Sequence, residues 1–393
     1  MADKSTYEEW KKPEVSRSYD FLAIGVFSLA LVILIVLSFF LIKGVKAYLD
    51  KPDPAVSKEV INTESEQMKE SPQKKVKPIW KEPPASQPQQ QAPHSKSVSI
   101  KAKLPKTTTN QELLKFVQRE AHVRILHMPR CLMITDISPL SKLTHLQELY
   151  IPGCKNIQSI APLSSLKNLR KLVMSDCTSI TDISPLLDFS SLTEVYMPPK
   201  VTNEQLALVL PNLPELRALG LSNCKLVTDI SGLSSLKDIY RLSIVGAKNL
   251  SDITPLAGLS ELRHLALIRT AVSDLSPLSD LPYLTSLTLW GSRNLTDLSP
   301  LASIKSLKSL GLNGSHGILD LTPLSELTYL TKLSLANMSG FNDISPLYGL
   351  THLKRLDLVN SKQISTRQIN ELKRKLPKCV VVDPYNYSKG RTS

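Results

Sequence analysis

The six residues "TDISPL" occupy Thr135 to Leu140 and recur unchanged at residues 181–186. Close variants follow further along the chain: "SDITPL" at 251–256, "SDLSPL" at 273–278, "TDLSPL" at 296–301, "LDLTPL" at 319–324 and "NDISPL" at 342–347. A phrase that returns at a regular spacing indicates an array of similar structural units stacked on one another. The spacing of this phrase therefore decides how the other residues are interpreted.

A second pattern, L-x-x-L-x-L with Val or Ile allowed for Leu, sets the period of the array. In "LQELYIPGC", Leu149 and Ile151 alternate with Glu148, Tyr150 and Pro152, which is the period of a strand with one buried face. Consecutive patterns start 22 to 24 residues apart. The first positions are Val123, Leu146, Leu169, Leu192, Leu216, Ile239, Leu262, Leu284, Leu307, Leu330 and Leu353.

The "TDISPL" phrase predicts a short helical turn on the other side of each unit. Pro139 suits the first helical position, where its missing N–H is not needed, and Ser138 can cap the turn. Ile137 and Leu140 would point inward. A row of Asp residues precedes these capping residues, and we favour a role in the turn over a row of metal-binding carboxylates. The row consists of Asp136, Asp182, Asp229, Asp252, Asp274, Asp297, Asp320 and Asp343.

This period and the phrase D-[IL]-[ST]-P-L resemble leucine-rich repeats, and most closely the internalin-type bacterial subclass, over about Val123 to Val382. The resemblance implies an α/β repeat fold, a solenoid of about 11 coils of 22–24 residues. A parallel β-sheet would line the concave face, and short helical turns would form the convex face.

The resemblance also implies Asn at the ninth repeat position, hydrogen-bonded to the turn of the neighbouring coil. Because Cys replaces Asn in four repeats, we expect this ladder of hydrogen bonds to be weak or absent. The spacing lacks a metal pattern such as C-x-x-C, and we interpret these residues as buried thiols, with disulfides between stacked coils as the alternative. The four residues are Cys131, Cys154, Cys177 and Cys224.

Three places depart from the phrase and carry a capping-box pattern, a Thr or Ser followed three residues later by Glu or Gln. They are Thr109 with Glu112, Thr202 with Gln205, and Ser365 with Gln368. We expect helices there. The first, within residues 108–122, would cover the open N-terminal end of the solenoid, as a stack of coils requires for solubility. The repeat domain would then span residues 123–383, with a last strand near residues 379–382.

The first third of the chain has a different composition. After a polar segment at residues 1–20, the stretch "FLAIGVFSLALVILIVLSFFLI" at residues 21–42 contains no charged residue. As a helix it would span about 33 Å, enough for one bilayer crossing. It is longer than the apolar core of a signal peptide and lacks a good cleavage site, so we favour an uncleaved transmembrane anchor over a removable signal peptide.

Residues 43–107 are rich in Pro, Lys and Gln and poor in large apolar side chains. Such a segment cannot bury enough surface to fold alone, so we expect a disordered spacer, and a flexible tail at residues 384–393. Four Lys or Arg residues precede the apolar stretch closely and four follow it, which leaves the orientation undecided by charge. The order of anchor, spacer and folded domain resembles bacterial envelope proteins. We therefore expect a cytoplasmic N-terminus and a periplasmic or extracellular repeat domain, with a cytoplasm-facing scaffold as the alternative.

The formal net charge of +13 raises the question of nucleic-acid binding. Much of it belongs to the spacer, and solubility or attraction to an anionic polymer or lipid surface explains it as well, so we expect no specific nucleic-acid partner. The seven His residues form no H-E-x-x-H pattern, and no phosphate-binding loop or G-x-S-x-G motif occurs. We expect a non-catalytic protein without cofactor or metal.

The register predicts where a ligand would bind, because strand residues that face away from the core lie in columns on the concave surface. Three adjacent coils would present Val245, Ile268 and Trp290 side by side, with Trp290 as the main anchor. The rim would consist of Arg241, His264 and Arg269, beside a floor of small residues. A contiguous apolar patch with a polar rim indicates a docking site for a protein or peptide. The alternative is a patch covered by the chain's own tail or by a second copy.

A second candidate site is the pair Tyr150 and Tyr196 on the first coils, whose rings could stack on sugars of an envelope polymer such as peptidoglycan. Ordinary surface tyrosines are the alternative. The sequence as a whole predicts a single-pass membrane protein that displays a non-catalytic leucine-rich-repeat module in the cell envelope for protein–protein interaction. Binding to a glycan or peptidoglycan polymer is the other function we considered.

Overall fold

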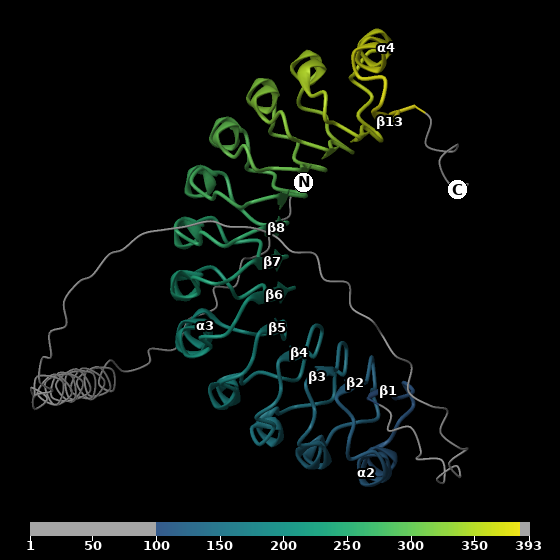
Figure 1. Cartoon of the computed structure of the whole chain (residues 1–393), viewed down its shortest axis with the longest axis vertical. Coiled ribbons are helices and arrows are strands. Elements are labelled where there is room, and N and C mark those ends of the chain that lie inside the picture. Colours follow the sequence, from purple (N-terminus) through teal and green to yellow (C-terminus); the bar gives the residue numbers. More distant parts are fainter. Residues whose placement is uncertain (1–99, 386–393) are drawn as a thin grey trace, which may run out of the picture. The chain divides into compact units, whose positions relative to one another are not determined.

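The computed structural model of the protein describes residues 100–385, and these form a stack of coils built on one parallel sheet. The described part of the sheet has 13 strands in sequence order, each hydrogen-bonded to the next. Figure 1 shows the strands along the inner side of the stack and the helical segments along its outer side. The solenoid with a concave parallel sheet is therefore confirmed.

The strands are short because, in each coil, the chain runs along the sheet for only three to five residues before it turns toward the convex side. Strands β6, β7 and β8 are the longest, at five residues each. The bounds are β1 Lys101–Lys103, β2 Ile125–His127, β3 Glu148–Tyr150, β4 Lys171–Val173, β5 Glu194–Met197, β6 Ala218–Ser222, β7 Arg241–Val245, β8 His264–Ile268, β9 Ser286–Thr288, β10 Ser309–Gly311, β11 Lys332–Ser334, β12 Arg355–Asp357 and β13 Val380–Val382.

Short 3-10 helices form most of the convex side, and three α-helices replace or precede them. The α-helices are α2 Asn110–Arg119, α3 Asn203–Val209 and α4 Thr366–Lys375. The 3-10 helices are η1 Ser138–Lys142, η2 Ala161–Leu163, η3 Ser184–Asp188, η4 Leu210–Asn212, η5 Ser231–Ser235, η6 Thr254–Leu256, η7 Ser276–Leu278, η8 Ser299–Ser303, η9 Thr322–Glu326 and η10 Ser345–Gly349.

A single apolar core runs through the stack from Leu104 to Leu376. In each coil the apolar residues at repeat positions 1, 4 and 6 point into it, as Leu146, Leu149 and Ile151 do with no exposed surface. Burial of one such side chain stabilises the fold by about 1.5–3 kcal/mol. The core side chains of each coil pack against those of the two neighbouring coils, so the coils are stable only as a stack.

The Asp of the repeated phrase holds the convex turn, and the expectation that Ser138 caps it is wrong. Asp136 accepts hydrogen bonds from the Ser138 N–H at 2.8 Å and from the Ser138 hydroxyl at 2.9 Å, while Ser138 itself lies inside η1. The seven other Asp residues accept the same backbone bond from the Ser or Thr two residues later. The predicted structural role of this Asp row is confirmed.

The two capping boxes predicted at Thr109 and Thr202 are both present, at the starts of α2 and α3. At α4 the Ser365 hydroxyl accepts from the Gln368 N–H, and the Gln368 amide reaches Asp343 of the preceding coil. Helices α2 and α3 also brace the next coil. Asn110 and Asn203 each accept two backbone bonds from the turn that follows, so each helix fixes the geometry of its neighbour.

A left-handed residue turns the chain away from the sheet at repeat position 8. In ten of the eleven coils this residue has a positive φ, including Arg130 at 55° and Arg269 at 54°. Glycine, Asn and Asp, which tolerate this conformation best, fill the eight other coils. The exception is Pro199, whose ring fixes φ near −65°. It stands where α3 replaces the usual turn.

The ladder at repeat position 9 exists, contrary to expectation, with Cys and Ser in place of Asn. The Cys154 thiol donates to the Met128 carbonyl at 2.8 Å and the Cys177 thiol to the Ile151 carbonyl at 3.0 Å. The Ser315 and Ser361 hydroxyls make the equivalent bonds at 2.9 and 2.7 Å. A small side chain with one donor is sufficient because the acceptor carbonyl of the preceding coil lies directly beside it.

This ladder is interrupted in the middle of the stack. Position 9 is occupied there by Ala247, Thr270 and Ser292, and the hydroxyls of Thr270 and Ser292 are buried without a hydrogen-bond partner. All five cysteines are free, so the disulfide alternative does not apply. Burial raises the pKa of Cys154 and Cys224 to about 12 and that of Cys177 to about 11, which keeps these donors protonated.

The folded domain begins earlier than expected. Lys101–Lys103, which we assigned to the spacer, form β1 and pair in parallel with β2. The alternation of Ile100, Ala102 and Leu104 with lysines is a strand pattern, hidden by the Lys- and Pro-rich composition around it. The remaining spacer, the apolar stretch 21–42 and most of the tail lie outside the described residues. Between residues 100 and 385, no helix is long and apolar enough to cross a membrane.

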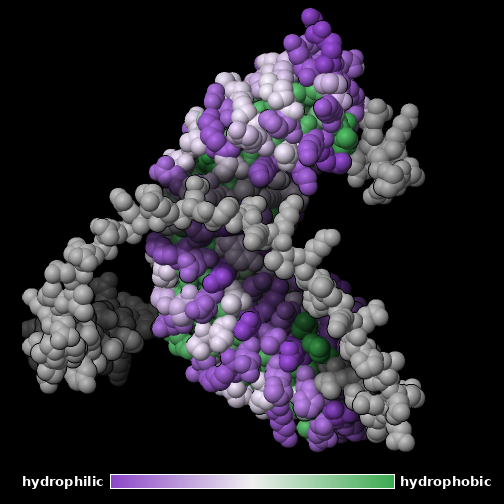
Figure 2. Space-filling view, in the orientation of Figure 1, coloured by the Kyte–Doolittle hydropathy of each residue, from purple (hydrophilic) through white to green (hydrophobic). Residues whose placement is uncertain are grey.

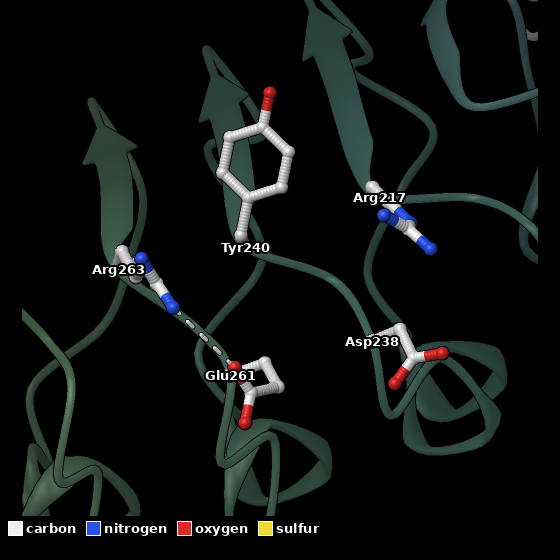
Figure 3. A pocket seen from close by; sticks show the side chains of 5 residues that line it. All are labelled: Arg217, Asp238, Tyr240, Glu261 and Arg263. Atoms are coloured by element: carbon white, nitrogen blue, oxygen red, sulfur yellow. Dashed lines mark ion pairs between the residues drawn. The ribbon is translucent and has the colours of Figure 1, made fainter. Parts of the chain in front are cut away.

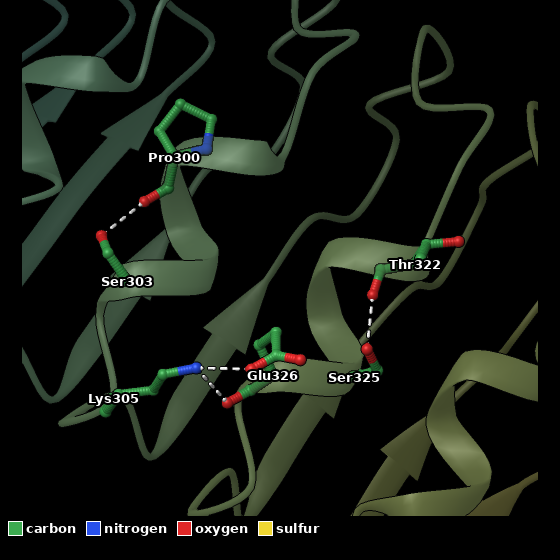
Figure 4. Close-up of polar contacts among 6 residues, drawn as sticks. All are labelled: Pro300, Ser303, Lys305, Thr322, Ser325 and Glu326. Carbon is green, nitrogen blue, oxygen red and sulfur yellow. Dashed lines mark hydrogen bonds and ion pairs between the residues drawn. The ribbon is translucent and has the colours of Figure 1, made fainter.

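Polar contacts between neighbouring 3-10 helices tie the convex side together (Figure 4). The Lys305 ammonium bonds both the Glu326 carboxylate, at 2.8 Å, and the Glu326 carbonyl, at 3.1 Å. Within single helices, the Ser303 hydroxyl bonds the Pro300 carbonyl and the Ser325 hydroxyl bonds the Thr322 carbonyl. These side chains are exposed, so the contacts orient the turns more than they stabilise them.

We expect Ser→Ala substitutions at repeat position 9 to lower the free energy of unfolding by different amounts, depending on whether the hydroxyl has a hydrogen-bond partner. Ser315→Ala and Ser361→Ala each remove a buried hydroxyl that bonds a carbonyl of the preceding coil and should lower the free energy of unfolding by about 1 kcal/mol. Ser292→Ala removes a hydroxyl that has no partner and should change the unfolding free energy by less than about 0.5 kcal/mol. Urea unfolding followed by circular dichroism measures both. A Ser292→Ala variant as unstable as the other two would contradict the assignment.

Candidate functional site

The concave face is formed by side chains on alternate strand positions, and the predicted apolar patch lies on it. Val245 and Ile268 are register partners at the ends of β7 and β8, and both are half-buried. Trp290 occupies the same repeat position in the next coil, where its carbonyl accepts from the Arg269 N–H at 2.8 Å. The structure therefore places the three residues in one column, as predicted.

The indole of Trp290 leans away from Ile268, toward the following coil. A Cβ added at Gly311 on β10 would overlap the Trp290 Nε1 atom, so the ring lies directly over this glycine. Trp290 remains 44% exposed. Sequence reasoning predicted its column but not its direction. The signal available was a glycine inside a strand, which often marks a close approach by another group.

The rim residues surround the patch at the start and the end of the strands. Arg241 and His264 open β7 and β8 and are register partners, whereas Arg269 follows β8. All three are exposed. Partial burial and the nearby guanidinium groups of Arg241 and Arg263 lower the pKa of His264, so this imidazole is neutral at pH 7. The positive charge of the rim thus comes from arginine.

Tyr150 and Tyr196, the second candidate pair, are separated by Val173 and do not form one aromatic platform. The Tyr150 ring stacks on His127 with 4.1 Å between centroids, and the Lys171 ammonium lies 5.5 Å from the same ring. Tyr196 covers Gly220 of the next coil.

Lys171 in turn pairs with Glu194 at 2.6 Å. Partners within the protein therefore already contact both rings. This arrangement offers less free aromatic surface for a sugar than the sequence suggested.

One hollow on the described surface was not anticipated from the sequence. Its volume is about 460 Å³, and its lining comes from three successive coils at the N-terminal ends of β6, β7 and β8 (Figure 3). It is lined by Arg217, Asp238, Tyr240, Glu261 and Arg263. Arg263 and Glu261 form an exposed ion pair at 3.7 Å. Cationic, aromatic and acidic side chains alternate around this hollow and suit the polar groups of a ligand. The hollow lies beside Arg241 of the rim.

Within residues 100–385, no group of His, Cys, Asp and Glu has an arrangement that could hold a metal ion. The face shown in Figure 2 is mostly hydrophilic, with hydrophobic residues in small separate areas.

The contact between Trp290 and Gly311 is testable in a chain with Trp10 and Trp80 replaced by Phe, in which Trp290 is the one remaining tryptophan. Gly311→Ala should displace the indole into solvent, shift its emission to longer wavelength and increase quenching by iodide. Gly349→Ala is the matched control, because a Cβ at Gly349 meets no atom within 4 Å. Unchanged emission in Gly311→Ala would show that the ring does not rest on this strand.

Comparisons with known proteins agree with the observed architecture. Residues 119–274 match the model of the family described as plant disease resistance protein RPS2-like, leucine-rich repeats. A leucine-rich-repeat protein of Leptospira interrogans aligns with a TM-score of 0.54 at 18% identity, over 71% of this chain and 80% of that one.

Two internalins of Listeria monocytogenes also align with the chain. InlF has 26% identity and a TM-score of 0.44, over 68% of this chain and 78% of InlF, and InlC2 has 25% identity and a TM-score of 0.36, over 57% and 76%. No curated protein sequence matches the chain. The family model and the shared fold agree with the repeat pattern. Residues 119–274 are therefore similar to leucine-rich repeats, and the described stack of coils shares the leucine-rich-repeat fold.

Proposed function

We propose that this protein binds a protein or peptide partner on the concave face of its repeat domain and has no catalytic activity. The observation that carries the proposal is the column of Val245, Ile268 and Trp290, in which two half-buried aliphatic side chains are followed, in the next coil, by a partly exposed indole that lies over Gly311. Exposed contiguous apolar side chains next to cations are typical of interaction sites. Repeat domains of this family generally serve as binding surfaces, which supports the same function.

The floor beside this column is low, which leaves room for a partner. Ser243, Ala266 and Thr288 lie in register on β7, β8 and β9, and none has a side chain larger than Thr. Gly311 continues the same column beneath the Trp290 ring. A partner residue can therefore reach the sheet between the apolar column and the arginines at the strand starts. Large side chains on this floor would prevent such an approach.

The anchor is expected to be Trp290. Trp290→Ala should weaken partner capture by about 2 kcal/mol, roughly a thirtyfold loss of affinity, because aromatic anchors dominate such interfaces. The matched control is Tyr329→Ala, which removes a more exposed ring (59% against 44%) that packs on His352 away from the patch. Pull-down of partners with the full chain, followed by titration of the captured protein, measures the difference. Unchanged affinity in a folded Trp290→Ala variant would exclude this site.

We further propose that the domain is displayed in the cell envelope by a membrane anchor at residues 21–42 and the spacer that follows. What supports this is the sequence alone, an uncharged apolar stretch long enough for one crossing. A tag fused after Ser393 should become accessible to protease once the outer barrier of the cell is opened, while the inner membrane is still sealed. Protection until the inner membrane is lysed would instead favour a cytoplasm-facing scaffold.

A further inference from the structure

The concave face carries a row of cations along its C-terminal coils. In six of the seven coils that contribute β6 to β12, at least one of the two positions at the strand start is Arg or Lys, and neither is Asp or Glu in any of the seven. We call these residues the basic row: Arg217, Arg241, Arg263, Lys308, Lys332, Lys354 and Arg355. All seven are exposed. Neighbouring strands lie about 4.8 Å apart, so the row follows the whole length of this part of the sheet.

Most of the basic row lacks a carboxylate partner within the protein. Among residues 100–385, the one ion pair that involves the row joins Arg263 to Glu261 at 3.7 Å between exposed side chains. Asp238 lines the same hollow as Arg217, on the side away from the strand (Figure 3). From Lys308 onward, neither strand-start position is acidic, and the carboxylate of Asp357 on β12 accepts a hydrogen bond from the Val359 N–H at 3.0 Å. The positive potential of the row is therefore left for another molecule.

The N-terminal coils differ, although they have the same backbone. At the same two positions, the first four coils hold three cations and two carboxylates, Glu148 and Glu194. Lys171 and Glu194 neutralise each other in an ion pair at 2.6 Å. Charge is therefore segregated along one face, balanced at one end and positive at the other. A need for solubility alone would not require this segregation.

We infer that the C-terminal half of the concave face binds an acidic, extended segment of a protein partner. Its carboxylates would lie along the basic row, and an apolar residue of the segment would contact Val245 and Ile268. This inference rests on the proposed function and adds the chemical class of the partner. Carboxylates bind Arg in paired hydrogen bonds and Lys as a point charge, so both residue types suit such a ligand.

Neither flank of the chain is acidic as a whole, although the stretch 59–70 carries Glu59, Glu64, Glu66 and Glu70 against Lys69. Residues 1–99 contain fourteen Lys and Arg against twelve Asp and Glu, and residues 386–393 contain only cations as charged residues. A nucleic acid also fits less well. Surfaces that bind single strands stack successive bases on aromatic rings. Among the described coils from β6 to β12, the concave columns offer few such rings, chiefly Tyr240 and Trp290, above a floor of Gly, Ser and Ala.

The probe is a fluorescein-labelled twelve-residue peptide in which Glu alternates with Gly and Ser around one central Leu. Its twin has Gln in place of every Glu. We expect the full chain to bind the acidic peptide at least tenfold more tightly than the twin at 50 mM NaCl, with the difference shrinking at 300 mM because exposed charges are screened. Equal binding of the two peptides would overturn the inference.

The variant is Lys308→Glu combined with Lys332→Glu, two exposed residues outside the apolar patch. It should lose on the order of tenfold in affinity for the acidic peptide and nothing for the twin. Lys237→Glu, an exposed cation in the turn after η5, is the matched control and should have little effect. Equal losses in the double variant and the control would overturn the inference, because they would reflect net charge alone.

Two further outcomes separate this inference from the proposed function. Weaker binding of both peptides in Trp290→Ala, together with no effect of the double charge reversal, would support the site but overturn the acidic partner. Loss of acidic-peptide binding in the double variant with no effect of Trp290→Ala would support the acidic partner and remove the anchor. A labelled single-stranded DNA of twelve nucleotides that binds more than tenfold tighter than the acidic peptide would overturn the inference in favour of nucleic acid.

Discussion

Every coil of this protein depends on the coils beside it for its hydrogen bonds and its apolar contacts. A strand of three to five residues in a parallel sheet has no partner within its own coil, so its N–H and C=O groups bond only to neighbouring strands. The Leu and Ile side chains that fill the interior likewise have no closed core until the next coil is added. Stacking is therefore the condition for folding, and the repeated sequence follows from it.

The turns make this stacking regular. Asp136 and its counterparts fix the convex turn by accepting from the residue two positions later, and a left-handed residue at position 8 turns the chain off the sheet. Between them, position 9 bonds back to the preceding coil through Cys or Ser. The ladder is interrupted at Ala247, Thr270 and Ser292, which belong to the same three coils as Val245, Ile268 and Trp290. These coils therefore present the proposed docking surface without the position-9 bond to the preceding coil.

The sequence was sufficient to predict the period, the parallel sheet, the helix starts at Thr109 and Thr202, and the columns of the concave face. These features follow from the two-residue alternation within each strand and from the repeat of about 23 residues. A single substitution does not obscure either pattern. Features that depend on side-chain direction were not predictable in the same way. The position-9 ladder was not predicted because the family pattern has Asn there, whereas one thiol or hydroxyl donor is enough to bond the carbonyl of the preceding coil. The lean of Trp290 over Gly311 follows from three-dimensional packing, and β1 was hidden by lysines that face solvent.

The backbone repeats along the whole concave face, but the side chains on it differ between the N-terminal and the C-terminal coils. Its N-terminal coils join His127, Tyr150, Lys171 and Glu194 in contacts within the protein, so their polar groups are already satisfied. Its C-terminal coils carry arginine and lysine side chains above a floor of small residues, and among residues 100–385 Arg263 is the one member of the basic row with an ion-pair partner. Binding is therefore expected at the C-terminal coils, where the protein's own groups have not already used the surface.

The measurement that tests this account most directly is carbodiimide cross-linking of the acidic peptide to the full chain, followed by mass spectrometry of the linked lysines. This reaction joins a carboxylate to an amine only where the two are in contact. We predict links to Lys308, Lys332 and Lys354 on the concave face, in a pattern that unlabelled peptide suppresses. Links that fall instead on Lys237 and Lys305 of the convex side, or equally on all exposed lysines, would contradict it.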